Sequence, residues 1–361
     1  MSAIPFVDLL AGHAPAPRSE GAQRQRSASY PSAHPHGWYH VARLDELAPG
    51  QVLAVRLLGD EVALFRTQGG EVCAIEGYCP HMGSHLAIGG TVQGDCLTCP
   101  FHGWSFRGDG RVAHVPYQQP NPRVRARSWP VTVCYGLVFL WHGPVDASGE
   151  PPYRPDRWPE LDTDTYVHRG RYAPRDIGMH LTEFAENSVD VAHFPVLHGR
   201  MHIPWTRWTM PLVTVDHQAD WQTDPDHPYL AYFLNDASLR FRCRPLPRSG
   251  ASTVATFVGP ASLVMFQITV PDVGSVLIAQ THTPLEAPGA PMRLQVRFTW
   301  WSERTMGRLL TSYIVGNWVS QWWQDVSVWE NKVHMQRPKL VGNDGPVGKL
   351  RAWYQQFYAA G

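Results

Sequence analysis

The hydrophobic positions of the chain fall into two regions with different periods. From about residue 37 to 145, apolar residues occur in short runs such as Val52–Leu57, Val62–Phe65 and Val72–Ile75, and glycine-rich turns separate these runs. Short apolar runs bounded by turn residues are typical of antiparallel strands. We therefore predict a small antiparallel β domain in this region.

Beyond a segment rich in Pro and Asp at 144–159, the pattern changes. Apolar residues recur with a helical period over 177–191, strand-like runs rich in Tyr, Phe, Thr and Val follow between 229 and 302, and helical spacing returns at 303–332 and 347–359. Helices that pack on one curved antiparallel sheet would bury both sets of apolar positions. The predicted fold class of this region is therefore α+β.

The same patterns give the expected boundaries. Residues 1–33 are rich in Ala, Ser, Pro, Gln and Arg and have no apolar period after Leu10, so we expect a disordered leader. The β domain is expected at 34–145, a linker at 146–165, and the α+β domain at 166–361.

Composition and charge narrow the possible classes of function. The 361 residues contain 31 Lys and Arg against 31 Asp and Glu, without a basic run, which argues against nucleic acid or an anionic membrane as partner. No signal peptide is recognisable, and no apolar run reaches the ~18 residues of a spanning helix. Cys73 and Cys134 lie in apolar strand-like runs and are interpreted as free thiols. A cytoplasmic protein is expected, which is compatible with peripheral membrane contact.

Two short segments each carry one Cys and one His: Cys79-Pro80-His81 and Cys99-Pro100-Phe101-His102. In a Rieske [2Fe–2S] centre two Cys hold one iron and two His hold the other. A structural zinc site is the alternative, but such sites usually pair like ligands within one segment. The mixed pair in each segment therefore favours a Rieske cluster with Cys79, His81, Cys99 and His102 as its ligands.

A second group of candidate ligands follows the linker. Asp190 and His193 lie three positions apart on one face of a predicted helix, and Pro195 allows the chain to turn so that His198 can approach them. Two imidazoles and one carboxylate form the facial triad of non-haem Fe(II) enzymes. Asp190 is the nearest carboxylate in sequence, but we prefer Asp325 as the third ligand. It lies in an aromatic-rich helix, where a buried carboxylate needs a partner such as a metal.

These residues also have ordinary structural interpretations. The alternative for His193 and His198 is simple packing or surface exposure, and the alternative for Asp325 is an ion pair on the helix surface. The apolar residues that follow the iron motif, Trp208 among them, are candidates either for a substrate pocket or for plain core. His202 has no spacing that makes it a ligand and is interpreted as a loop or surface residue.

Together the two motifs resemble those of the Rieske non-haem iron oxygenases. The likeness is greatest to the steroid-acting branch, which contains cholesterol 7-desaturases, 3-ketosteroid 9α-hydroxylases and sterol C-4 demethylating oxygenases. It is carried by Gly37-Trp38-Tyr39, Cys99-Pro-Phe-His-Gly-Trp104, Glu186-Asn187-x-x-Asp190-x-x-His193-Phe-x-x-x-His198 and Asp325-x-x-x-Trp329-Glu-Asn-Lys332. The resemblance implies a helix-grip catalytic domain with a hydrophobic pocket above the iron. It also implies a homotrimer in which Asp190 links a cluster histidine of one subunit to an iron histidine of the next.

The resemblance implies the terminal oxygenase of a system with several components. A separate NAD(P)H-dependent ferredoxin reductase or ferredoxin is expected, because no Gly-x-Gly-x-x-Gly fingerprint follows a strand. Activation of O2 at the mononuclear Fe(II) would hydroxylate, desaturate or oxidatively demethylate a hydrophobic substrate, for which a sterol or steroid is expected. The alternatives are a Rieske monooxygenase of a non-steroid secondary metabolite, aromatic compound or amine, and an electron-transfer protein with the cluster alone.

Overall fold

The computed structural model describes residues 19–358, which form two compact units. The β unit consists of Ala33–Arg157, His282–Pro288 and residues 357–358. The sheet–helix unit consists of residues 19–32, Trp158–Thr281 and Gly289–Gln356. Antiparallel sheets form both units, and the sheet–helix unit adds the long helix α3 (Arg308–Trp329), so the predicted fold class is confirmed.

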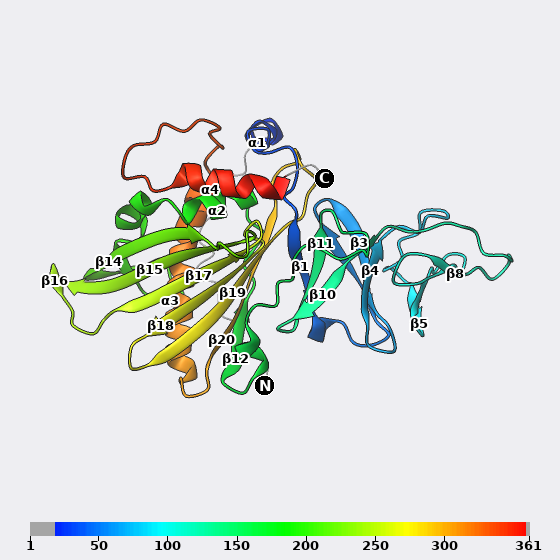
Figure 1. Cartoon of the computed structure of the whole chain (residues 1–361), viewed down its shortest axis with the longest axis horizontal. Coiled ribbons are helices and arrows are strands. Elements are labelled where there is room, and N and C mark those ends of the chain that lie inside the picture. The colour runs from blue at the N-terminus through cyan, green and yellow to red at the C-terminus, as the bar shows by residue number, and fades with distance from the viewer. Residues whose placement is uncertain (1–18, 359–361) are drawn as a thin grey trace. The chain divides into compact units, whose positions relative to one another are not determined.

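Three small antiparallel sheets make up the β unit (Figure 1). In spatial order their strands are β1 (Gly37–Arg43), β11 (Leu137–His142) and β10 (Val131–Cys134); β2 (Val52–Leu57), β3 (Asp60–Arg66), β4 (Val72–Glu76) and β9 (Ser128–Trp129); and β5 (Thr91–Gln93), β6 (Cys96–Thr98), β7 (Ser105–Phe106) and β8 (Val112–His114). Phe65, Ile75 and Phe106 are fully buried in a core that the second and third sheets share. Cys79 and Cys99 belong to the same core, so both Cys–His segments start from rigid, buried positions.

A nine-stranded antiparallel sheet forms the centre of the sheet–helix unit. In spatial order it contains β12 (Tyr166–Tyr172), β20 (Leu294–Glu303), β19 (Gly274–Pro284), β18 (Leu263–Val270), β17 (Ala251–Val258), β15 (Leu230–Phe241), β14 (Thr209–Thr223) and β13 (Arg200–His202), and the short β16 (Arg244–Pro245) pairs with β15. The strands curve around α3, which crosses behind them in Figure 1. Helices α2 (Leu181–Asn187) and α4 (Val347–Tyr354) lie together at one end of the sheet.

Aromatic contacts fix α3 against the sheet. Trp318 packs on Phe266 of β18, with ring centroids 4.2 Å apart. At Gly316 the absence of a side chain admits Trp205, because a Cβ on this glycine would lie only 2.4 Å from the indole Nε1. The helix therefore holds the carboxylate of Asp325, which is buried, in a defined position over the sheet.

The N-terminal segment differs from the expected disordered leader wherever the structure describes it. Glu20–Ser27 form the helix α1, and Arg26 near its end is buried. The guanidinium of Arg26 donates to three backbone carbonyl groups, those of Gly178, Lys332 and Trp329. These partners are far from Arg26 in sequence, so local composition did not reveal them. The rest of the predicted leader, residues 1–18, lies outside the described residues.

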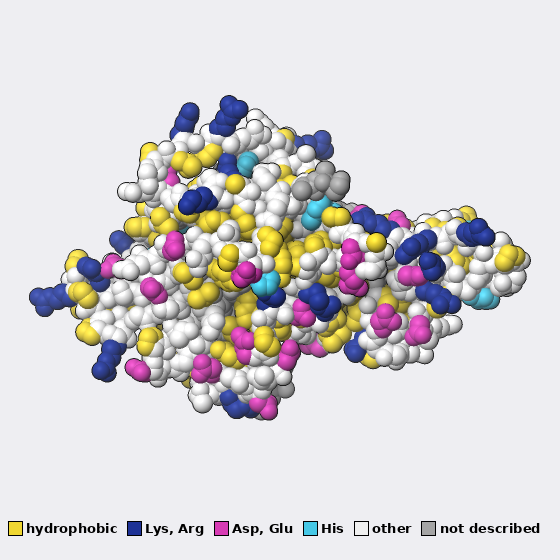
Figure 2. All heavy atoms as spheres, in the orientation of Figure 1, with side chains coloured by type: hydrophobic (Ala, Val, Ile, Leu, Met, Phe, Trp, Pro, Cys, Tyr) yellow, Lys and Arg dark blue, Asp and Glu magenta, His cyan; other side chains and the backbone are white. Residues whose placement is uncertain are grey.

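Some boundaries also differ from the predictions. The helical period at 177–191 corresponds to α2 alone, and the stretch at 303–332 begins with the end of β20 before α3 starts at Arg308. Short single-turn helices occur at Leu44–Glu46, Pro159–Asp162 and Gln355–Tyr358. On the face shown in Figure 2, basic and acidic side chains are interspersed. Among the described residues, no helix is both long enough and apolar enough to cross a membrane.

Candidate metal centres and cavity

The two Cys–His segments of the β unit form loops of the same construction. In the first, the N–H of Cys79 donates to the carbonyl of Ser84 at 2.8 Å, and the N–H of Gly83 donates back to the carbonyl of Cys79 at 2.9 Å. In the second, the N–H of Cys99 donates to the carbonyl of Trp104 at 2.8 Å. Gly83 has a positive φ of 73° and Gly103, at the matching position, one of 71°, a conformation that favours glycine.

The four side chains of these loops fit a cluster with two different irons. The thiols of Cys79 and Cys99 are buried, and burial raises the pKa of Cys79 to about 11, whereas coordination by a metal would favour the thiolate. The rings of His81 and His102 lie 4.7 Å apart at the loop tips, and the His81 ring stacks on Trp104 at 4.5 Å. Two sulfur and two imidazole donors at the end of one small domain match the donor set of a Rieske centre.

A second set of donors converges in the sheet–helix unit. The Nε2 of His198 lies 3.0 Å from Oδ1 of Asp325, and the Nε2 of His193 lies 4.0 Å from the same oxygen. One ligand atom from each of the three residues can be chosen so that all lie within 4.8 Å of one another. The three side chains are at most 9 % exposed. The structure thus brings together the three residues that were predicted from the sequence as ligands of a mononuclear metal.

A widened helical turn explains how two histidines five positions apart can converge. After α2 the chain forms a single 3-10 turn at Val191–His193 and then a π-helical turn at Phe194–His198. The i→i+5 geometry of a π turn suits a five-residue spacing, which an α-helix would rotate apart. Pro195 stands at the start of this turn, where its missing N–H costs nothing.

The surroundings of His193 favour a bound cation. Its Nδ1 donates to the backbone carbonyl of Asp190, which leaves Nε2 with the lone pair that a metal needs. Burial would lower the pKa of His193, but hydrogen bonding to Asp190 and the charges of Asp325 and Asp190 outweigh it and raise the pKa. The Nδ1 of His198 is buried without a hydrogen-bond partner. The negative potential of this site therefore suits a divalent metal ion held by two imidazoles and one carboxylate.

Asp190 stands beside this set rather than within it. The carboxylate Oδ2 lies 3.8 Å from Nδ1 of His193, and the side chain is 44 % exposed. Burial would raise the pKa of Asp190, but its hydrogen bond and charge interaction with His193 prevail and lower it. A partly exposed, ionised carboxylate thus lies next to His193, one of the candidate metal ligands.

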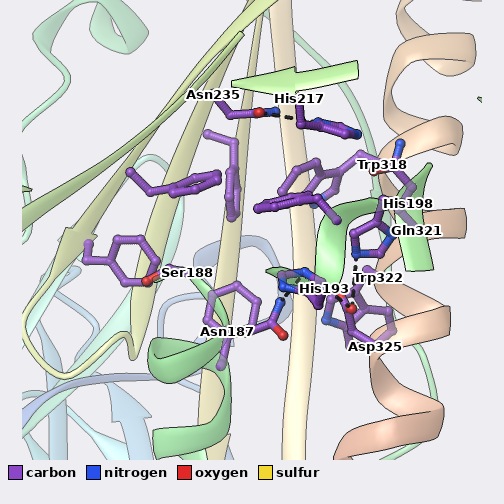
Figure 3. Close-up of a pocket in the computed structure, with 15 residues that line it drawn as sticks. Asn187, Ser188, His193, His198, His217, Asn235, Trp318, Gln321, Trp322 and Asp325 are labelled. Carbon is purple, nitrogen blue, oxygen red and sulfur yellow. Dashed lines mark hydrogen bonds and ion pairs between the residues drawn. The ribbon is translucent and has the colours of Figure 1, made fainter. Parts of the chain in front are cut away.

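The donors open onto a small aromatic cavity of about 60 Å³ (Figure 3). Its lining includes His193, His198 and Asp325 on one side. Its apolar members come from α2, the π turn at Phe194–His198, α3 and the strands of the sheet. The apolar part of the lining consists of Phe184, Phe194, Phe233, Phe257, Phe266, Trp318 and Trp322. An apolar lining with few polar groups is typical of sites for hydrophobic ligands.

The sequence did not identify every residue of this region correctly. Trp208, a candidate for the pocket, is 70 % exposed and does not line the cavity. His202, interpreted as a loop or surface residue, lies on β13 and is completely buried. His217 of β14 and Asn235 of β15 line the cavity and were not singled out. They belong to strands, where neither spacing nor a motif distinguishes a lining residue from any other.

Comparisons with known proteins identify the family of each of the two parts of the chain. Residues 37–132 match the family model of a Rieske [2Fe-2S] domain, and residues 140–358 match that of a 3-ketosteroid 9alpha-hydroxylase C-terminal domain. A cholesterol 7-desaturase of Xenopus laevis is 31 % identical over 347 residues, which cover 93 % of this chain and 74 % of the relative.

Two further proteins are similar to this chain, one in sequence and one in fold. A probable 3-ketosteroid-9-alpha-monooxygenase oxygenase component of Rhodococcus rhodochrous is 26 % identical, with coverage of 91 % of this chain and 81 % of the relative. Among solved structures, dicamba monooxygenase bound to dicamba superimposes with a TM-score of 0.62 at 20 % identity, covering 89 % of this chain and 96 % of the other. At this identity the structural likeness shows the fold alone.

Proposed function

Because the chain belongs to the Rieske non-haem iron oxygenases with a 3-ketosteroid 9α-hydroxylase type of catalytic domain, we propose that it oxidises a sterol or steroid. Membership of the family makes it the terminal oxygenase of a system that uses O2 and a reductase partner. The product would be an alcohol, an alkene or a demethylated sterol. The observation that carries the proposal is the His193–His198–Asp325 set at the edge of an aromatic cavity.

Two sets of residues would hold the two metal centres. Cys79, His81, Cys99 and His102 would hold a [2Fe–2S] cluster, and His193, His198 and Asp325 would hold one Fe(II). When bound, these groups supply electron transfer and O2 activation. The protein contributes buried donors, a small cavity with a mainly aromatic lining, and a backbone acceptor at Asp190 that fixes the orientation of His193.

Asp190 would be the positioning residue between the two centres. Its ionised carboxylate lies near Nδ1 of His193 and remains partly exposed, so a cluster histidine of a neighbouring subunit has access to it. We propose a homotrimer in which electrons cross subunits at this place. The donor of the electrons would be a ferredoxin or a flavoprotein reductase fed by NAD(P)H.

The names of the relatives and the apolar lining support a steroid substrate. The cavity, however, is too small to hold a steroid unless side chains of its lining move. Sites for drug-sized ligands have volumes of roughly 300–1,000 Å³, several times the 60 Å³ found here. A tetracyclic substrate therefore requires that aromatic side chains turn away as it enters. Trp318 and Phe266 line the cavity where α3 meets the sheet, and their close contact would have to loosen to enlarge it.

The same volume favours a second candidate function, the oxidation of a smaller aromatic compound or amine. Solved structures of similar fold include dicamba monooxygenase and a protein in complex with caffeine. A planar bicyclic ligand would need less movement of the aromatic lining than a sterol.

One single-turnover experiment separates the two candidates. The purified oxygenase, loaded with iron, is reduced anaerobically, mixed with one candidate substrate and exposed to O2. The panel contains cholesterol, a 3-ketosteroid, a methoxybenzoate and an N-methylated purine. We expect product and faster cluster reoxidation with a steroid only. Product from the benzoate or purine alone would replace the steroid proposal, and cluster reoxidation without product from any class would contradict it.

A further inference from the structure

We propose that the projecting end of the large sheet is a docking surface for an anionic lipid bilayer. This sheet tip consists of residues 207–215, which include the start of β14, and residues 237–248, which include the end of β15 and the short β16. The inference goes beyond the proposed function, because it concerns where the protein meets a lipophilic substrate and not how that substrate is oxidised. The proposed substrate class only explains why such a surface would be useful.

Backbone contacts hold the two segments of the sheet tip together. Val213 is paired with Phe241 in the antiparallel register of β14 and β15. The N–H of Arg242 donates to the carbonyl of Leu212 at 2.9 Å, and Phe241 is paired in turn with Arg244 of β16. Figure 1 shows β16 and the adjoining ends of β14 and β15 at the left edge of the view, where they project from the rest of the sheet. Residues that are far apart in sequence thus form one surface.

A tight hairpin turn leaves the side chains of the tip in solvent. Arg242 and Cys243 are the two residues between the paired positions Phe241 and Arg244, and both have positive φ, 48° and 63°. A two-residue turn with positive φ at both positions normally contains Asn or Gly. Every residue from Phe241 to Arg248 is exposed. The chain therefore accepts an unfavourable backbone conformation at a point where its long side chains pack against nothing that buries them.

The charge of the sheet tip differs from that of the whole chain. Its two segments contain no Asp or Glu, but they contain the five arginines Arg207, Arg240, Arg242, Arg244 and Arg248. Arg240 pairs with Asp216 just outside the tip. The three arginines that follow it form no ion pair with the described residues. The zero net charge of the protein argued against an anionic membrane, but it averages over this local excess of positive charge, and clustered basic side chains are attracted to anionic headgroups.

Apolar side chains share the surface with the arginines. These side chains are between 38 % and 70 % exposed and belong to Trp208, Met210, Leu212, Phe241 and Leu246. Figure 2 shows dark blue and yellow side chains together at the left edge of the molecule. An acidic protein or a nucleic acid would use the arginines alone. A bilayer uses both kinds of group, because the apolar side chains enter the acyl region while the cations contact the headgroups.

The sheet tip is connected to the cavity through the same two strands. His217 of β14 and Asn235 of β15 line the cavity, and Val213 stands four positions before His217. At ~3.4 Å per residue, these two positions of β14 lie roughly 14 Å apart along the strand. A bilayer at the tip would therefore hold the cavity near the lipid phase, in which a sterol dissolves.

Sedimentation with sucrose-loaded vesicles tests the surface on the full-length protein. Vesicles of phosphatidylcholine alone are compared with vesicles of phosphatidylcholine and phosphatidylglycerol, and we expect binding to the anionic vesicles. Arg242→Gln combined with Arg244→Gln should weaken this binding roughly 30-fold, since each basic residue near an anionic surface contributes a factor of about five. The matched control is Arg111→Gln combined with Arg123→Gln, two exposed arginines of the β unit, which should bind like the wild type.

A second pair of substitutions tests whether apolar side chains enter the bilayer. Phe241→Ser combined with Leu246→Ser leaves every arginine of the tip in place and should weaken binding to the anionic vesicles at least tenfold, because less apolar area leaves water. Binding that depends on the arginines alone would disappear at high salt, whereas wild-type binding should persist in part. Thermal unfolding of each variant shows that it is folded.

Cys243 at the apex of the hairpin allows a measurement that leaves the other residues of the tip unchanged. Among the cysteines it is the exposed one. A dye whose emission depends on polarity, attached to this thiol, should shift to shorter wavelength when anionic vesicles are added, and lipids that carry a quencher in the acyl chain should quench it. Ser148→Cys combined with Cys243→Ser places the same dye on an exposed part of the β unit and should show no shift.

The outcomes separate this inference from the proposed function. Equal vesicle binding by the wild type and the arginine variant, or a dye at Cys243 that stays in water, would overturn the bilayer surface. A dye shift that depends on protein concentration and not on vesicles would replace it by a contact between copies of the chain. Oxidation of cholesterol supplied in cyclodextrin, without any vesicle binding, would leave the steroid function standing and reject the surface. Vesicle binding through the tip without oxidation of any steroid would support the surface and reject the steroid substrate.

Discussion

The five-residue step from His193 to His198 shows how a small departure from regular helix can define a site. An α-helical turn would direct the two imidazoles along different faces, whereas the π turn at Phe194–His198 directs both Nε2 atoms toward Oδ1 of Asp325. The backbone carbonyl of Asp190 holds the first ring in place. The proposed iron site therefore depends on local backbone geometry as much as on ligand identity.

Replacement of Asp325 by Ala should remove the mononuclear metal and leave the cluster intact. Iron content should fall from about three to about two per chain, because only the cluster irons remain. Turnover should fall by more than about 100-fold, since loss of a ligand exceeds the effect of losing a residue that only supports one. Metal analysis and the visible spectrum of the cluster measure the two parts separately. Asp220→Ala, on the exposed part of β14, is the control; full iron content in Asp325→Ala would show that Asp325 is not a ligand.

Asp190→Asn isolates the carboxylate, because the backbone carbonyl that orients His193 stays in place. We expect iron content to be unchanged and electron transfer from the cluster to be roughly 10–100-fold slower, the usual effect of removing a group that supports a metal ligand. Stopped-flow bleaching of the reduced cluster, in the presence of substrate and O2, gives this rate. A rate equal to that of the wild type would reject Asp190 as the bridge.

The sequence predicted the groups that carry a motif and missed those that do not. Cys79 and Cys99 were recognised because each shares a short loop with a histidine, and Asp325 because an aromatic helix isolates it. His202 and His217 lie on strands of the large sheet, far in sequence from Asp325, and the folded sheet brings both near the proposed iron site. Side-chain period on a strand indicates a face, but it does not indicate what that face encloses.

Among the elements, α3 carries the largest share of the site. It contributes Asp325 to the metal set and Trp318, Gln321 and Trp322 to the cavity. Its helical character could be predicted from the apolar spacing. Its contact with Trp205 could not, because that contact depends on a glycine whose environment is known only once the chain has folded.

The substitution Gly316→Ala should destabilise the protein by about 1–3 kcal/mol, the usual cost of inserting atoms into a packed core. Its Cβ would lie 2.4 Å from Trp205, so the indole or the helix must shift. Gly348→Ala in α4 is a matched control, since no atom lies within 4 Å of its Cβ. That change should instead be neutral or stabilising by up to ~1 kcal/mol. Urea unfolding measures both, and equal effects would show that the Trp205 contact is not tight.

At the scale of the whole molecule, transfer between subunits can be tested by complementation. A chain with Cys99→Ser should lack the cluster, and a chain with Asp325→Ala should lack the iron. If electrons pass from one subunit to the next in a closed ring, mixed assemblies from equal amounts of both chains should recover about a quarter of wild-type activity. Each variant alone should be inactive, and mixtures that remain inactive would place both centres of a working pair in one chain.

The anchoring of α1 through Arg26 has a practical consequence for handling this protein. Residues 1–33 look dispensable by composition, and a shortened version would naturally be made to begin near residue 34. Such trimming would strip the guanidinium from three carbonyl oxygens, including that of Trp329, one helical turn beyond the proposed iron ligand Asp325. The shortened protein would then retain its metal poorly because Arg26 is missing, although all the proposed metal ligands would still be present.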